Sequence, residues 1–131
     1  MPLIIPANTI SGGYEVANSL RFDDGSSDYL TRTPSSAGNR RTFTFSAWIK
    51  RGSNLGSNQV IYDGGATNPT TTIRFSSESS SDDKLNIFHY SGSFTTQVVT
   101  NREFRDTSAW YHIVVAFDTT QATSSNRINV Y

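Results

Sequence analysis

The chain contains no cysteine, and its 11 basic and 11 acidic residues give a formal charge of zero. Without thiols it can form neither a disulfide framework nor a thiolate metal site, and it has no cysteine nucleophile. This fits a protein made in a reducing compartment. The balanced charge provides no electrostatic footprint for a phosphate backbone, so we expect no nucleic acid partner.

Long apolar segments are also missing. No apolar run approaches the ~20 residues of a membrane-spanning helix, and the first residues lack the basic start and the longer apolar core of a secretory signal. We therefore expect no membrane association. If the protein acts outside a cell, we expect it to be released by another route, such as lysis.

Helical periodicity is absent, whereas Ser- and Thr-rich turn segments interrupt the chain about every dozen residues, as in antiparallel β proteins. A chain of 131 residues is long enough for one domain with its own core. Most of that core would come from 8 Phe, 6 Tyr and 2 Trp.

The clearest strand is expected at residues 41–50, where Phe43, Phe45, Ala47 and Ile49 share one face and Trp48 lies on the other. Residues 110–118 are apolar at both parities, which predicts a central strand covered on both faces. Shorter strands are expected at 19–22, 29–32, 59–62, 71–75, 84–90, 94–100 and 127–131. The basic pairs Arg40-Arg41 and Lys50-Arg51 are interpreted as exposed charges at strand ends.

The first residues differ from the rest. Pro2 and Pro6 bracket the apolar residues Leu3, Ile4 and Ile5, and Gly12-Gly13 would form a hinge. We interpret residues 1–18 as an extended N-terminal docking arm and residues 19–131 as a β-sandwich. The alternative is that the arm forms an edge strand of its own sandwich.

Two segments carry a family resemblance: Phe-Thr-Phe-Ser-Ala-Trp-Ile-Lys-Arg at 43–51 and Trp-Tyr-His-Ile-Val-Val-Ala-Phe-Asp at 110–118. With this spacing, the chain resembles the laminin G-like and pentraxin-like members of the concanavalin A-like lectin/glucanase superfamily. The resemblance implies an all-β, antiparallel jelly-roll β-sandwich. The family's next strand ends in Tyr-Val-Asn-Gly, and residues 127–131 match only its opening, so we expect the sandwich to be the N-terminal part of a longer domain.

Residues 19–23 and 29–33 also resemble the form of this module found in tailed-phage virion proteins. The resemblance implies a non-enzymatic structural or binding module of a virion appendage, such as a tail fibre, spike or capsid appendage. We expect it to be made in the host cytoplasm, to be a homo-oligomer, to attach to other virion proteins and to bind host surface glycan. Two alternatives are a glycoside hydrolase of the glucanase branch and a free lectin.

Hydrolysis would need two carboxyl groups facing one another across the scissile bond. Glu15, Glu78 and Glu103 lie far apart, and no strand carries a Glu-x-Asp-x-Glu pattern. No Gly-x-Ser-x-Gly elbow exposes a serine, and His89 and His112 are interpreted as hydrogen-bonded strand histidines. The sequence therefore favours binding over catalysis.

The candidate ligand-binding residues are Trp48, Tyr62, Asp63 and Asp118. The indole of Trp48 either presents an aromatic face to a sugar ring or is covered by another element. The resemblance implies a rim Ca²⁺ held by Asp63 and Asp118, with residues 24–28 as another location. Ordinary turn capping is the competing interpretation of these aspartates.

Overall fold

A computed structural model describes residues 20–65, 68–77 and 82–131. The docking-arm residues Pro2, Leu3, Ile4, Ile5 and Pro6, and the expected boundary between residues 18 and 19, lie outside these residues. The chain divides into two compact units, Met1–Ala37 and Gly38–Tyr131.

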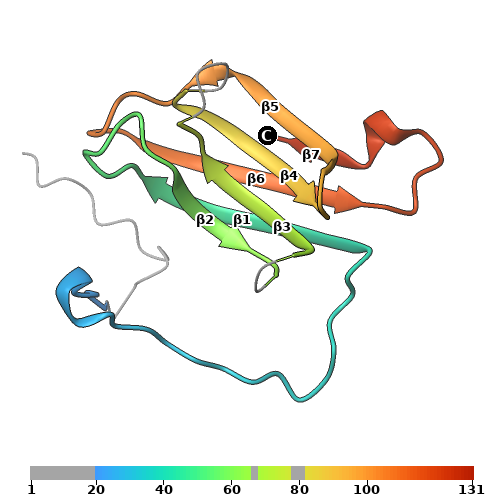
Figure 1. Ribbon diagram of the computed structural model, residues 1–131, viewed down its shortest axis with the longest axis horizontal. Coiled ribbons are helices and arrows are strands. Elements are labelled where there is room, and N and C mark those ends of the chain that lie inside the picture. Colours follow the sequence, from blue (N-terminus) through green and yellow to red (C-terminus); the bar gives the residue numbers. More distant parts are fainter. Residues whose placement is uncertain (1–19, 66–67, 78–81) are drawn as a thin grey trace, which may run out of the picture. The chain divides into compact units, whose positions relative to one another are not determined.

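Seven strands, all in the second unit, form two antiparallel sheets among the described residues (Figure 1). The three-stranded sheet has the order β1 (Thr42–Lys50), β6 (Trp110–Asp118), β7 (Ile128–Val130). The four-stranded sheet has the order β2 (Gln59–Asp63), β3 (Thr70–Phe75), β4 (Lys84–Tyr90), β5 (Phe94–Glu103). In the described ranges, only two short 3-10 turns are helical: η1 (Asp24–Ser26) and η2 (Ser124–Asn126). The predicted all-β sandwich is confirmed.

No helix in the described part of the chain has the length and hydropathy needed to cross a membrane.

The core lies between the facing sheets and follows from alternation along each strand. In β1, Phe43, Phe45 and Ile49 point inward as predicted, and they pack against the fully or nearly buried side chains of the core. That core comes from both sheets: Ile73, Phe75, Leu85, Ile87, Phe104, Tyr111, Ile113, Val115 and Phe117. Because successive side chains of a strand point to opposite faces, the side chains between the core residues lie on the outer face of each sheet.

The prediction for residues 110–118 is only half right. β6 is central in its sheet, paired with β1 along nine residues and with β7 over three. Its inner face is buried, but Trp110 and His112 on its outer face are exposed. The apolar residues on both faces therefore predicted correctly that the strand is central in its sheet. The predicted layer over its outer face is not present among the described residues.

The strands expected at 19–22 and 29–32 are wrong for the residues described there. Instead, Asp23 caps η1: its carboxylate accepts a hydrogen bond from the Gly25 amide, and Asp28 accepts one from the Asp23 amide. Short side chains that bond nearby main-chain groups compete with strand pairing.

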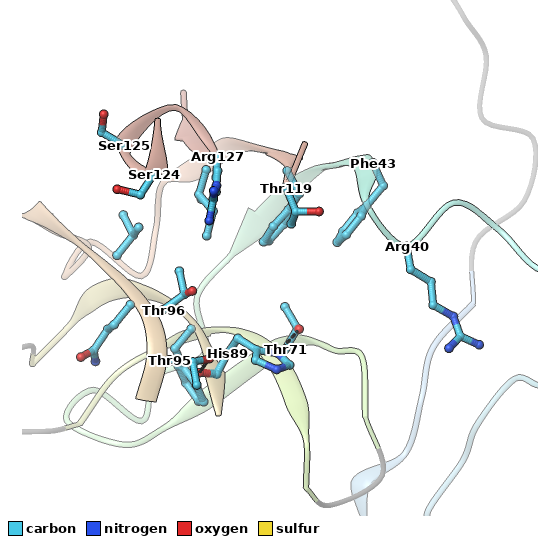
Figure 2. A pocket seen from close by; sticks show the side chains of 15 residues that line it. Arg40, Phe43, Thr71, His89, Thr95, Thr96, Thr119, Ser124, Ser125 and Arg127 are labelled. Atoms are coloured by element: carbon cyan, nitrogen blue, oxygen red, sulfur yellow. Dashed lines mark hydrogen bonds between the residues drawn. The ribbon is translucent and has the colours of Figure 1, made fainter. Parts of the chain in front are cut away.

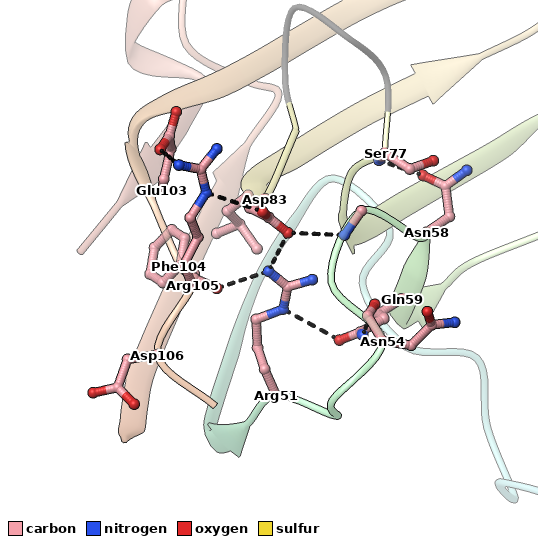
Figure 3. Close-up of polar contacts among 12 residues, drawn as sticks. Arg51, Asn54, Asn58, Gln59, Ser77, Asp83, Glu103, Phe104, Arg105 and Asp106 are labelled. Atoms are coloured by element: carbon pink, nitrogen blue, oxygen red, sulfur yellow. Dashed lines mark hydrogen bonds and ion pairs between the residues drawn. The ribbon is translucent and has the colours of Figure 1, made fainter. Parts of the chain in front are cut away.

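Arg51 was expected to be exposed, and this is also wrong. Its guanidinium lies in the interior, where it donates to Asp83 Oδ1 and to the Phe104 carbonyl oxygen, both at 2.7 Å, and to Gln59 Oε1 at 3.2 Å (Figure 3). The same Asp83 oxygen accepts the Gly56 amide at 3.2 Å. One buried ion pair thus joins the end of β1, the loop before β2, the turn before β4 and the segment after β5.

Candidate functional site

A cavity of about 660 Å³ opens at one end of the sandwich, between the two sheets (Figure 2). Its walls combine phenyl rings, hydroxyl groups and basic side chains. Strands β1, β3, β4, β5, β6 and β7 and the turn η2 all contribute: the lining residues are Arg40, Phe43, Thr71, Phe88, His89, Thr95, Thr96, Gln97, Val98, Phe117, Thr119, Ser124, Ser125, Arg127 and Ile128.

The apolar part of the cavity is built by strand pairing. Phe43 of β1 lies opposite Phe117 of β6, and their rings stack with centroids 4.4 Å apart. Both rings point inward because they share the core face of the sheet. The stacked pair therefore provides a fixed apolar wall at the point where the two sheets separate.

The polar part is rich in hydroxyl groups from several elements. Some are already engaged: Thr71 Oγ1 lies 2.9 Å from His89 Nδ1, and Thr119 donates to the Arg41 carbonyl oxygen at 3.1 Å. The hydroxyls of Thr96 and Ser124 have no hydrogen-bond partner among the described residues, so both can donate to or accept from a ligand.

Charge in the cavity is of one sign. Arg40 and Arg127 line it, and no Asp or Glu does so within the described part of the chain. Figure 2 shows the Arg127 side chain directed into the cavity, whereas Arg40 extends away from it. The Nε of Arg127 donates to the Gln121 carbonyl oxygen at 2.8 Å. This bond holds the guanidinium in place, and its two terminal nitrogens have no hydrogen-bond partner among the described residues, so they can bind a ligand.

The structure separates the residues predicted to bind a ligand. Asp118 pairs with Thr42 at the start of β1, whereas Trp48 lies six residues further along that strand, on the outer face. The interpretation that another element covers Trp48 is wrong, because its indole is exposed and stacks on His112. Tyr62 is half-buried, with its ring 6.3 Å from that of Phe43 and 6.0 Å from that of Phe45.

Both aspartates predicted to hold calcium accept hydrogen bonds within their own turns. Asp63 accepts from the Gly65 amide and the Thr70 hydroxyl, and Asp118 accepts from Thr120 and Gln121. The Thr120 hydroxyl, followed by Gln121, lowers the pKa of Asp118. In the described part of the chain, no three His, Cys, Asp or Glu side chains gather around a common point. Calcium binding stays a prediction, and an upward shift of the melting temperature in Ca²⁺ that Asp118→Asn abolishes would support it.

Sequence reasoning missed the residues that make the cavity basic and rich in hydroxyl groups. Ser124 lies in the turn η2 between the two last predicted strands, and Arg127 was predicted only as the first residue of the last strand. His89 was correctly interpreted as a hydrogen-bonded strand histidine, but its position in a cavity wall depends on how the sheets diverge. The available signal was the Ser-Ser-x-Arg run directly before the last strand.

Comparison with known proteins gives one result. A family model described as the concanavalin A-like lectin/glucanases superfamily matches residues 24–131. No significant match was found among curated proteins or solved structures. The matched region includes all seven strands of the sandwich. The chain therefore belongs to the concanavalin A-like lectin/glucanase superfamily.

Proposed function

We propose that this chain is a non-enzymatic glycan-binding module and that the cavity at the end of the sandwich holds the glycan. The observation that carries the proposal is the composition of the cavity, which combines stacked phenyl rings with hydroxyl groups that have no partner among the described residues. Its volume of about 660 Å³ lies in the range of small-molecule sites. A sugar ring matches such walls because it has an apolar C–H face and a rim of hydroxyls.

A hydrolase has less support. Glycoside hydrolysis needs an acid and a second carboxylate, roughly 5–5.5 Å apart for retention and further apart for inversion. None of the described residues that line the cavity is acidic. The nearby Asp118 is held ionised by hydrogen bonds from its own turn, which lower its pKa, so it is poorly suited to act as the proton donor.

The charge of the cavity favours a glycan that carries a carboxylate or sulfate group. The two terminal nitrogens of Arg127 can bind the two oxygens of such a group side by side. The hydroxyls of Ser124 and Thr96 line the same cavity and would meet the neighbouring sugar hydroxyls.

An array of acidic and neutral glycans, probed with a multimeric form of the chain, tests this proposal. Acidic glycans are expected to bind, and Arg127→Ala is expected to weaken that binding about 10- to 150-fold, the loss of a charged hydrogen bond. Arg127→Lys should retain part of the affinity. The matched control is Arg32→Ala, an exposed arginine of the other unit. Glycan turnover, or acidic binding unaffected by Arg127→Ala, would contradict the proposal.

We further propose that the module is carried by a tailed-phage virion appendage, where it attaches to other virion proteins as a homo-oligomer. This rests on the resemblance of residues 19–23 and 29–33 to the form of this module found in tailed-phage virion proteins. Several copies on one particle would convert weak single-site binding into strong attachment. Mass spectrometry of purified particles is expected to detect the chain. If the chain is found only in the lysate and never in particles, this part of the proposal is wrong.

A further inference from the structure

The outer face of strands β1 and β6 is low at one end and raised at the other. Alternate residues of the two strands share this face, and each lies opposite a residue of the other strand. The side chains are short toward one end and large toward the other, in the order Thr42 with Asp118, Thr44 with Ala116, Ser46 with Val114, Trp48 with His112 and Lys50 with Trp110. These residues are called the outer β1–β6 face below, and Ser46 and Val114 form its midpoint.

The raised end exposes two indoles and holds one of them in place. Trp48 and Trp110 are 65% and 62% exposed, which is unusual for such large side chains. The Trp48 ring stacks on His112 with centroids 4.9 Å apart, and His112 Nε2 lies 3.1 Å from Ser46 Oγ. A side chain whose rotamer is already restricted loses less entropy on binding. Tryptophan is also enriched among the residues that contribute most to protein–protein interfaces, so this end of the face suits a protein partner.

Charge on the outer β1–β6 face is confined to its two ends. Lys50 lies at the raised end and Asp118 at the low end, whereas the other residues of the face, all of them described, carry no permanent charge. Each also interacts with a neighbour of opposite charge, Lys50 with Asp106 and Asp118 with Arg41. An uncharged centre with charges at the rim is typical of interfaces, where the charges set the orientation more than the affinity.

We propose that the outer β1–β6 face is a self-association surface, on which a second copy of this chain packs face to face about a twofold axis. The axis lies in the interface at right angles to the strands and passes through Ser46 and Val114. Rotation about this axis keeps β1 over β1 and β6 over β6, but it reverses the direction along the strands. Ser46 and Val114 therefore each meet the same residue of the second copy.

This arrangement places large side chains of one copy over short side chains of the other. Trp48 lies over the partner's Thr44, and Trp110 lies over the partner's Asp118, which also comes beside Lys50. The raised end of each copy therefore fills the low end of the other, as side chains interdigitate between packed sheets. An axis parallel to the strands would instead stack the two raised ends on one another and leave the low ends uncovered.

The size of the contact indicates a reversible dimer. The exposed parts of the two indoles supply about 200–300 Å² per copy, from about 150–250 Å² for a whole aromatic side chain. With the shorter residues between them, two copies bury roughly 1,000 Å², which is the lower limit for a specific interface. The surface goes beyond glycan binding: it gives the proposed homo-oligomer an interface that depends on neither the glycan nor the virion.

Sedimentation equilibrium of the full chain over a wide concentration range tests the proposal. The mass is expected to rise with concentration from 14.5 kDa toward twice that value. Ser46→Lys and Ser46→Glu each place two like charges on the axis and are expected to raise the dissociation constant about 10-fold or more. An equimolar mixture of the two variants should associate again, because opposite charges then meet. Asn101→Lys and Asn101→Glu, at an exposed position of β5 in the other sheet, should change nothing.

Trp48→Ala gives a second measurement at the raised end, where loss of the indole is expected to raise the dissociation constant about 5- to 30-fold. An unaltered chain that stays monomeric would overturn the proposal. So would association that neither Ser46 variant weakens, or a mixture of these variants that stays monomeric, since Ser46 then does not face its own copy. Circular dichroism checks that each variant is folded. Because the measurement uses neither glycan nor virus particles, its failure is distinguishable from failure of the proposed function.

Discussion

Arg51 and Asp83 illustrate how one side-chain pair can connect distant parts of the chain. Asp83 has a positive φ of 58°, and its main chain also accepts the Phe104 amide at 2.8 Å. The Arg51 guanidinium lies 4.6 Å from the centre of the Phe75 ring. Nothing in the sequence indicated that Arg51 turns inward, because a basic residue after a strand is usually solvated.

Removing the charge of Asp83 is expected to destabilise the fold. Asp83→Asn leaves the fully buried Arg51 side chain without its counter-charge, which should cost about 3–5 kcal/mol of unfolding free energy. Arg105→Gln is the matched control, because Arg105 binds the same carboxylate from a position 60% exposed and should cost at most about 1 kcal/mol. Urea unfolding of the three proteins measures both values. Equal losses of unfolding free energy in Asp83→Asn and Arg105→Gln would contradict the expectation that the buried arginine depends more strongly on the ion pair than the exposed one.

The same pair makes stability depend on acid. The hydrogen bond from Arg51 lowers the pKa of Asp83, against the opposing effect of burial. Because the folded pKa lies below the unfolded one, the stabilisation is complete above about pH 4 and is lost as the pH falls through the folded pKa. The fall in unfolding free energy between pH 5 and pH 2.5 is expected to be smaller in Asp83→Asn. An unchanged acid slope would contradict this assignment.

At the scale of elements, alternation predicted β1 and its buried face correctly, because one side of that strand is apolar and the other is polar. It failed for the outer face of β6, since Val114 and Ala116 look like core residues until their neighbours are known. It failed again at residues 20–22 and 29–32, where Asp23 and Asp28 bond main-chain groups locally. The end cavity could not be predicted, because it depends on where two sheets diverge.

Two adjacent valines of β6 test which face is covered. Val115 is fully buried, whereas Val114 on the outer face is half-buried. Val115→Ala is expected to cost about 2 kcal/mol, from two lost methyl groups and the cavity they leave. Val114→Ala should cost less than about 1 kcal/mol. Thermal or urea unfolding compares them, and a larger loss at Val114 would mean that another layer covers the outer face.

At the scale of the whole molecule, the buried core of the described residues and the strands that pack on it lie between Phe43 and Val130. If residues 1–18 are a docking arm, deletion of residues 1–13 is expected to lower the unfolding free energy by less than about 1 kcal/mol, which corresponds to a fall in melting temperature of less than roughly 3–5 °C. The shortened chain should then fold but fail to join its assembly. Loss of the cooperative transition would show instead that these residues belong to the sandwich.

The pairing of β1 with β6 also has a consequence during protein synthesis. These strands share nine residue pairs, yet about sixty residues of chain separate their facing ends, Lys50 and Trp110. At roughly 5–20 residues per second, β6 is made about 3 to 12 s after β1. Throughout that interval the nascent chain carries the apolar side chains of Phe43, Phe45 and Ile49 without their partner strand, exposed to mispairing and to chaperones.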